Sequence, residues 1–210
     1  MQDLQHMTVA ELSALTASEA PVPGGGSISA MAGAFAASLT GMVAKLTHSK
    51  LKYAPVREEM LGIDKEAESL RLKLLDDIQR DSASYQSFME ALKMPKGSED
   101  EIKARQNAMQ AGLKEACVVP LSIAQDASTV LKLAVAAVKR GNISTYSDAL
   151  VGAMLARTAM LGAVSNVRIN LESIQDEAFR MEMNKACDLL EAQAYQLEQE
   201  AVIAAKTREE

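Results

Sequence analysis

Aromatic side chains are scarce in this sequence: tryptophan is absent, and phenylalanine and tyrosine make up only 3% of the 210 residues. Proteins that bind single-stranded nucleic acid stack bases on aromatic rings, and phosphate backbones require clustered lysine and arginine. The sequence has few aromatic side chains and a formal net charge of −6, so we expect no nucleic-acid partner. Alanine, leucine and methionine supply most of the apolar volume instead. Because all three are strong helix formers, we expect an all-α protein.

Cysteine and histidine are also rare, with two of each. Cys117 and Cys187 form no CxxC pair, and His6 and His48 lie far apart, so the spacings predict no metal site. Two isolated thiols on apolar helical stretches are typical of a reducing compartment. The first residues do not show the basic segment and apolar run of a secretory signal. We therefore expect a cytoplasmic protein.

Charge is missing altogether from residue 20 to residue 44. A run of this length is sufficient to cross a bilayer of about 30 Å, so a membrane span is one interpretation. The segment nevertheless contains two prolines and five glycines, and few large apolar residues that favour insertion. We prefer a central helix of a bundle, entered through a glycine-rich turn and capped by Ser27, and we expect no membrane partner.

The whole chain reads as helices separated by proline and glycine. The predicted helices cover residues 9–17, 27 to an end between 45 and 52, 55–92, 98–140, 147–171 and 175–206. Thr8 and Glu11 form a capping box for the first helix, Pro55 opens the third, and Pro120 interrupts or kinks the fourth. No strand pattern is found. We predict a single all-α domain over residues 1–210, a bundle of roughly six to eight helices.

Three consecutive glycines, Gly24, Gly25 and Gly26, stand directly before Ser27. Free N–H groups at a helix N-terminus attract anions and carbonyl oxygens, and glycine lets a ligand approach the backbone closely. These residues are therefore candidates for a binding site. A simple turn between two helices is the other interpretation.

Asp81 falls on the apolar stripe of the long predicted helix, after Ile78 and before Tyr85. A carboxyl group placed there must find a partner, raise its pKa or face a cavity, because burying an unpaired charge is costly. Such a group can serve as a general acid or base near neutral pH. The alternative is that the stripe rotates here and leaves Asp81 in solvent, or that Asp81 caps a neighbouring helix.

Further polar residues lie on a small-residue face of the predicted helix over 147–171. Asp148 stands at its beginning and Asn166 and Asn170 at its end, and buried amides need partners that a heteroaromatic ligand can supply. Asp148 and Asn166 are about 27 Å apart along a helix, so within one subunit they do not reach the same small ligand. They contact different ends of a long ligand, meet across a symmetric interface, or simply hold helices together.

Lys45 and Lys52 belong to a basic cluster at the end of the uncharged helix. Such a cluster is either a solvated helix end or a basic rim for a polyanionic ligand.

In combination these residues resemble a known family. The motifs are Pro-Val-Pro-Gly-Gly-Gly-Ser at 21–27, Asp81-x-x-x-Tyr85, Leu92-Lys-Met-Pro95-Lys96, Arg105, Ala116-x-x-x-Pro120-Leu121, Ser147-Asp148 and Asn166-Val-x-Ile-Asn170-Leu. From about residue 8 to 175, their order and spacing are similar to those of the cyclodeaminase/cyclohydrolase family. This family includes the C-terminal domain of formiminotransferase-cyclodeaminase and stand-alone bacterial methenyltetrahydrofolate cyclohydrolases. Ser84 departs from the alanine that the family usually has before the aromatic residue.

The resemblance implies an all-helical homodimer that acts on a folate, with or without a polyglutamate tail, and needs no metal or redox cofactor. In the cyclodeaminase reaction, N10 of 5-formiminotetrahydrofolate attacks the formimino carbon and ammonia leaves, giving 5,10-methenyltetrahydrofolate. In the cyclohydrolase reaction, water opens the methenyl ring to 10-formyltetrahydrofolate. We prefer the first reaction and keep the second as its alternative. A non-catalytic helical module, whose small-residue stripes are assembly surfaces, is the alternative of a different class.

The same resemblance suggests a role for each candidate residue. Asp81 would transfer the proton, Tyr85 would orient Asp81 or the ligand, and the loop 24–27 would line the folate site through its backbone amides. The other suggested substrate contacts are Asp148 for the guanidine-like edge of the pterin, Lys45 and Lys52 for the glutamate tail, and Asn166 and Asn170 for ligand or interface.

Overall fold

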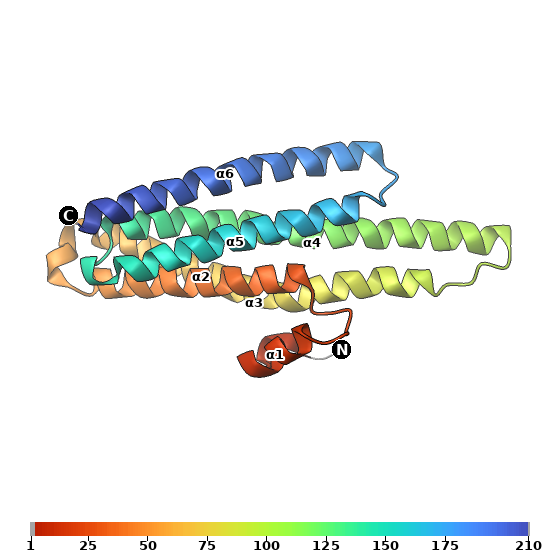
Figure 1. Ribbon diagram of the computed structural model, residues 1–210, viewed down its shortest axis with the longest axis horizontal. Coiled ribbons are helices and arrows are strands. Elements are labelled where there is room, and N and C mark those ends of the chain that lie inside the picture. Colours follow the sequence, from red (N-terminus) through yellow and green to blue (C-terminus); the bar gives the residue numbers. More distant parts are fainter. Residues whose placement is uncertain (1–2, 210) are drawn as a thin grey trace.

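Six α-helices make up most of residues 3–209, the part of the chain that the computed structural model describes (Figure 1). They are α1 (Val9–Thr16), α2 (Gly25–His48), α3 (Arg57–Leu92), α4 (Glu99–Arg140), α5 (Tyr146–Leu171) and α6 (Glu177–Glu209). Three short 3-10 helices, η1 (Leu4–His6), η2 (Leu51–Val56) and η3 (Ile143–Thr145), precede α1, α3 and α5. No strand occurs within residues 3–209. The predicted all-α class and the approximate number of helices are confirmed.

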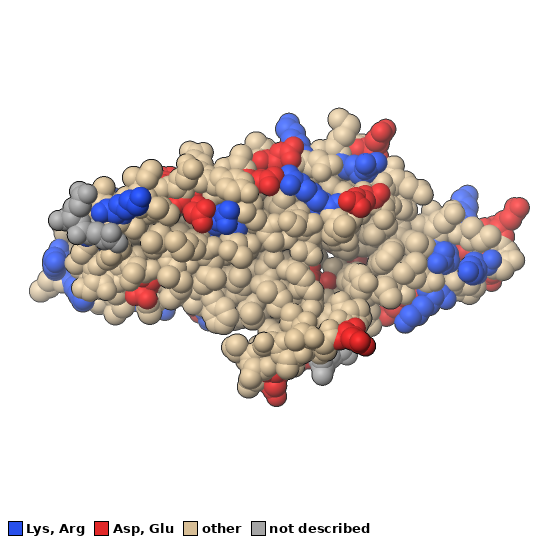
Figure 2. Space-filling model, viewed as in Figure 1, with Lys and Arg blue, Asp and Glu red and all other residues tan. Residues whose placement is uncertain are grey.

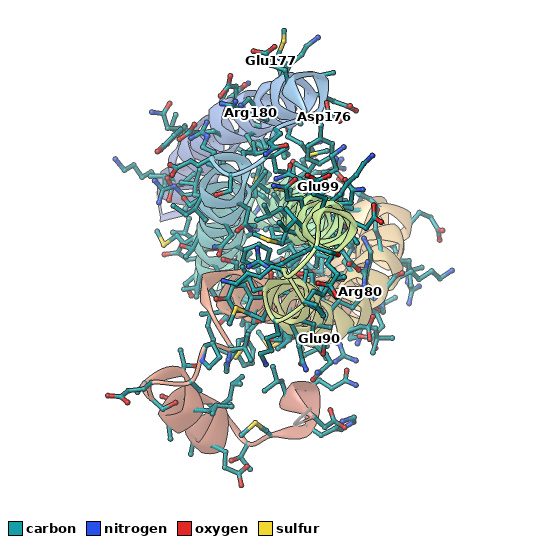
Figure 3. The ribbon with its side chains drawn as sticks, turned by 90° about the vertical axis from the view of Figure 1, so that its right-hand side faces the viewer. Arg80, Glu90, Glu99, Asp176, Glu177 and Arg180 are labelled. Atoms are coloured by element: carbon teal, nitrogen blue, oxygen red, sulfur yellow. The ribbon has the colours of Figure 1, made fainter. Side chains whose placement is uncertain are left out.

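The five long helices lie lengthwise beside one another, and the hairpin formed by α3 and α4 extends beyond the others at one end (Figure 1). Seen along the bundle, α1 and the N-terminal segment lie outside the group of long helices (Figure 3), with Leu4 and Leu12 buried against it. This segment is attached to α3 by a hydrogen bond of 3.0 Å from the Leu4 N–H to Gln79 Oε1. The chain then reaches the start of α2, where the glycine-rich loop lies against the bundle.

Two capping boxes define helix starts. Thr8 and Glu11 cap α1 reciprocally, as predicted, and Ser98 and Glu101 do the same for α4. In each case the hydroxyl accepts the N–H of the third helical residue and the glutamate accepts the N–H of the capping residue. Two orphan backbone donors at each helix start are thereby satisfied.

Two predicted helix starts are wrong, and the interruption considered for the fourth helix is absent. Ser27 does not cap α2, which begins two residues earlier, with Gly24 at the N-cap position. Pro55 does not open α3: it lies within η2, and α3 begins at Arg57. Pro120 does not interrupt its helix, because α4 runs through it from Glu99 to Arg140, close to the predicted bounds of 98–140.

Small residues bring α2 and α5 close together. A methyl group added at Gly152 would lie 3.4 Å from the carbonyl oxygen of Ala36, and one added at Gly162 would lie 2.3 Å from Ser29 Oγ. Such contacts leave no space for larger side chains. The uncharged helix therefore packs directly against the helix that carries the small-residue face.

Three helical segments are long and apolar enough, by length and composition, to cross a membrane: Gly25–His48, a stretch of Glu99–Arg140, and Ile143–Leu171. Inside the bundle, 61%, 56% and 44% of their respective most apolar windows are buried. Much of this apolar surface is thus used for packing between helices.

Candidate functional site

A cavity of about 320 Å³ lies where the start of α2 meets α3, α4 and α5. Its polar lining consists of Asp81, Ser84, Tyr85, Asn166 and Asn170, together with the backbone at Gly24 and Gly26. A cavity of this volume can enclose a small ligand, or one part of a larger ligand. The predicted glycine loop, the predicted acid and both asparagines therefore meet in one place.

The Asp81 carboxylate is held at the N-terminus of α2. Its Oδ2 accepts a hydrogen bond of 2.8 Å from Ser27 Oγ, and the carboxylate also accepts the backbone N–H of Ser27. Ser27 Oγ lies 3.0 Å from Ser82 Oγ, and both serines are buried. Because Ser27 is the third residue of α2, Asp81 supplies the acceptor that the exposed helix end lacks. It caps a neighbouring helix and lines the cavity at the same time.

Burial raises the pKa of Asp81 above its ordinary value of 3.8, although the side-chain and backbone hydrogen bonds from Ser27 act in the opposite direction. The carboxyl group therefore holds a proton more readily than an exposed aspartate does. Such a group can accept a proton from a bound ligand and return it, which is the work of a general acid and base.

Two of the three glycines are required by close contacts. A methyl group at Gly26 would lie 2.2 Å from Asp81 Oδ1, and one at Gly25 would lie 3.0 Å from Asn166 Nδ2. A methyl group at Gly24 would meet nothing within 4 Å. The glycine run therefore lets two polar side chains touch the start of α2, which a simple turn does not need.

Both asparagines use their amide nitrogen on a backbone carbonyl. Asn166 Nδ2 donates to the carbonyl oxygen of Gly162 at 2.8 Å, and Asn170 Nδ2 donates to that of Ala116, also at 2.8 Å. Each side chain is left with its oxygen Oδ1 as an acceptor beside the cavity. With Asp81, the cavity offers three acceptor side chains, which matches a ligand edge that carries N–H donors.

Tyr85 lies one turn after Asp81 and is 37% exposed at the cavity. No hydrogen bond joins its hydroxyl to another residue in the described part of the chain, so the group can bind a ligand. Ser84 differs, because its Oγ donates to the backbone oxygen of Asp81 at 2.7 Å. Its hydroxyl is therefore used within α3.

Lys45, Lys52 and Asp148 are not near this cavity in the chain. Lys45 follows Gly25 by twenty residues of α2, a distance of about 30 Å. It lies 3.5 Å from Asp64, and Lys52 stands over the ring of Tyr53 at 5.5 Å. Asp148 begins α5, whereas the asparagines end it. The structure thus divides the predicted residues between the two ends of the bundle.

Other hollows are less suited to chemistry. One of about 520 Å³ lies between α4 and α6, and one of about 450 Å³ lies between α2 and α3. Their charged residues are engaged in ion pairs, such as Lys139 with Glu200 and Lys45 with Asp64. Within residues 3–209, no group of three or more His, Cys, Asp or Glu side chains is arranged to hold a metal ion.

Ala116 and Ile169 line the cavity but were not among the predicted site residues. Ile169 gives no signal in the sequence beyond standing between the two asparagines. Ala116 does give one, because it precedes Pro120 by four residues. A proline inside a helix leaves the carbonyl four residues earlier without its usual donor, which marks a polar atom in need of a partner.

Comparison with known proteins identifies the relatives of this chain. The sequence profile described as formiminotransferase-cyclodeaminase matches residues 8–189. A methenyltetrahydrofolate cyclohydrolase of Methylorubrum extorquens is 35% identical over 178 residues, which cover 85% of this chain and 86% of the relative. A formimidoyltransferase-cyclodeaminase of Gallus gallus is 33% identical over 83% of this chain, which spans only 32% of that longer protein.

A solved structure shows the same fold. The crystal structure of a formiminotetrahydrofolate cyclodeaminase from Thermotoga maritima aligns with a TM-score of 0.87 at 31% sequence identity, over 97% of this chain and 98% of that one. The long profile match and the extensive alignment with a relative of similar length lead to one conclusion. The chain belongs to the formiminotransferase-cyclodeaminase family.

Proposed function

We propose that this protein is a folate one-carbon enzyme that converts 5-formiminotetrahydrofolate to 5,10-methenyltetrahydrofolate with release of ammonia. One observation carries the proposal: the carboxyl group of Asp81 is held by the start of α2 inside a cavity lined by two asparagines. The family supplies the substrate class, since its named relatives are cyclodeaminases and a cyclohydrolase.

Asp81 performs the proton transfers of this reaction. As N10 bonds to the formimino carbon, the carboxylate accepts the N10 proton. The resulting tetrahedral carbon carries N5, N10 and the former imino nitrogen, and Asp81 returns the proton to that nitrogen to make an amino group. A second proton from solvent makes this group a leaving ammonia, whose departure with the C–N electron pair gives the methenyl cation. The chemistry needs proton transfer only, so we propose that no metal or redox cofactor takes part.

The substrate contacts follow from the acceptor-rich lining. Asn166 and Asn170 accept N–H groups of the pterin through Oδ1, Tyr85 orients Asp81 or the ligand, and the amides of the loop 24–27 line the site. The cavity is smaller than a complete folate, so the aminobenzoyl-glutamate part extends out of it.

The cyclohydrolase reaction is the second candidate, because a relative of that name covers most of both chains. In that case Asp81 accepts a proton from water as the water oxygen bonds to the methenyl carbon. The bond from that carbon to N5 then breaks as Asp81 returns its proton to N5, the remaining hydroxyl proton leaves to solvent as the carbonyl forms, and 10-formyltetrahydrofolate results.

Methenyltetrahydrofolate absorbance tests both reactions with the purified protein. An increase from the formimino substrate supports the cyclodeaminase, and a decay faster than the uncatalysed rate supports the cyclohydrolase. Absence of both would contradict the proposal and favour a non-catalytic helical module.

We also propose that two copies associate through the exposed face of α2 and α5. Large apolar side chains are exposed along both helices: Phe35, Met42, Leu46, Val151, Met154 and Ile169. The middle of this face carries no charged residue (Figure 2). Ile169 also lines the cavity, so a second copy seated there would reach its mouth. Sedimentation should show a dimer, and Met154→Lys should weaken it.

In such a dimer the remote residues acquire their proposed roles. Lys45 and Lys52 meet the glutamate tail of the substrate and Asp148 contacts its pterin edge, in each case at the site of the other subunit. A shared two-fold site resolves the distance of about 30 Å within one chain. Free buried thiols at Cys117 and Cys187 are in keeping with the proposed cytoplasmic location.

A further inference from the structure

Pro120 lies buried in the middle of α4, a helix that runs on for twenty residues beyond it. A proline at this position has no N–H to donate, and its ring pushes on the carbonyl of the residue four positions earlier. That residue is Ala116, which is buried and lines the cavity. The Ala116 oxygen therefore lacks its normal helical donor at the point where α4 borders the site.

The missing donor is replaced from another helix. Asn170 Nδ2, on α5, donates to the Ala116 oxygen at 2.8 Å across a separation of 54 residues in the chain. Because a buried carbonyl without a partner is costly, this bond fixes which end of the Asn170 amide faces α4. The nitrogen faces the carbonyl, and Oδ1 is left for the cavity.

We propose that Pro120 is a positioning residue for the site: by freeing the Ala116 carbonyl, it orients the Asn170 amide so that Oδ1 is presented to the ligand. That Asn170 Oδ1 binds a folate rests on the proposed function. The orientation of the Asn170 amide is independent of that function, because it follows from the missing N–H of Pro120 and one hydrogen bond. The proline thus acts on substrate binding through two other residues and touches no reacting atom.

The test is Pro120→Ala. The restored N–H at position 120 competes for the Ala116 oxygen, and the Asn170 amide loses its fixed orientation. We expect KM for the folate substrate to rise about five- to tenfold, the value of one hydrogen bond, with kcat nearly unchanged. Thermal stability should stay level or increase, since a helix-interior proline is replaced by the best helix former. A merely structural role would lower stability and leave KM alone.

A readout independent of activity follows the Asn170 side-chain amide protons by NMR, assigned with the Asn170→Asp variant. In the wild-type protein we expect slow exchange with water, and in Pro120→Ala faster exchange. Unchanged exchange overturns the proposal. Faster exchange with unchanged KM also overturns it, because the orientation of the Asn170 amide would then have no effect on ligand binding. Absence of turnover by the wild-type protein would instead count against the proposed function, and the exchange experiment would still decide the orientation.

Three further variants complete the design. Pro55→Ala, at an exposed proline in η2, is the matched control and should leave KM and the Asn170 signals unchanged. In an Asn170→Ala background, Pro120→Ala should add nothing to KM, whereas additive effects would contradict the link. If Pro120→Ala does not fold, Pro120→Val serves in its place: it also restores the N–H at position 120 but keeps more of the side-chain volume, and it should raise KM and speed the Asn170 amide exchange similarly.

Discussion

Asp77 and Asp81 lie one turn apart on α3, and burial raises the pKa of both above 3.8. Asp77 has no exposed surface, and Arg80 donates to its Oδ1. Asp126 raises its pKa further, while Arg80 and Lys73 lower it. Its second oxygen, Oδ2, has no hydrogen-bond partner among the residues described. Asp81, in contrast, has partners on α2 and opens to the cavity.

The difference teaches that a raised pKa does not by itself identify a catalytic group. Arg80, the partner of Asp77, lies on the flank of α3 away from α1 and the N-terminal segment (Figure 3). What distinguishes Asp81 is the space beside it: Gly26 leaves room for the carboxylate, and two asparagines stand across the cavity. Placement next to a ligand-sized space is therefore the better criterion.

The largest expected effect separates the two aspartates directly. Asp81→Asn should lower turnover by about 10²-fold or more, because the amide cannot exchange the proton, while the fold and the oligomer stay intact. Asp77→Asn is the matched change one turn away and should alter turnover by only a few-fold. Steady-state kinetics with circular dichroism measure both. Equal losses of turnover in the two variants would contradict the distinction between a catalytic Asp81 and a structural Asp77. Near-normal turnover in Asp81→Asn would show that Asp81 is structural.

A graded series over the glycine loop sharpens the comparison. In Gly26→Ala the new methyl group collides with Asp81 and must displace it, and a shift of about 1 Å at a catalytic group costs about 10²-fold. Gly25→Ala presses only on Asn166 and should mainly raise KM. Gly24→Ala points into open space and is the control. Losses that do not decrease from position 26 to 25 to 24 would contradict the proposed contacts.

A smaller effect is expected from the hydrogen bond that restrains Asp81. Ser27→Ala removes a donor that lowers the pKa of Asp81, so this pKa should rise and the dependence of activity on Asp81 ionisation should move to higher pH. The lost bond should also cost about 1 kcal/mol in the free energy of unfolding. Ser84→Ala is the control, because Ser84 donates to the backbone oxygen of Asp81 and not to its carboxylate. Identical pH profiles for all three proteins would show that Ser27 does not tune the acid.

The smallest effect is on stability as a function of pH. The folded protein binds the proton of Asp81 more tightly than the unfolded chain, so this group adds stability as pH falls from its raised pKa towards 3.8. Above the raised pKa both states are ionised, and the cost of burial is fully present. Asp81→Asn should therefore be at least as stable as the wild type at pH 7, and the advantage should shrink towards pH 4. Urea unfolding at each pH measures the difference in free energy of unfolding between the variant and the wild type. A difference that grows as the pH falls would contradict the prediction.

The helices could be predicted from the sequence because their signals are local. The Thr8 capping box and the proline and glycine breaks act within a few residues, so most helix boundaries followed. Ser27 was misplaced for a reason outside its own helix: its hydroxyl donates to Asp81 and is not free to cap α2. Pro120 was expected to disturb α4, but a side chain from α5 takes up the carbonyl that it frees.

The site was predictable in part. Asp81 stood out because it broke an apolar pattern, and the glycine run stood out because it exceeded the needs of a turn. The pairing of Asn170 with Ala116 spans 54 positions and depends on how α5 lies along α4, which no local pattern encodes. The positions of Lys45 and Lys52 at the far end of the bundle follow from the helix rise alone, whereas their partners depend on tertiary packing.

The crowded contact at Gly162 has one more consequence. Its carbonyl holds the amide of Asn166, and its missing side chain admits Ser29, whose hydroxyl in turn donates to the Gly25 oxygen. The same few atoms thus set both the spacing of two helices and the inner wall of the binding site. Substitutions at this inner wall would disturb the packing of α2 against α5. Efforts to change the ligand specificity should therefore begin at the exposed lining residues Tyr85 and Ile169.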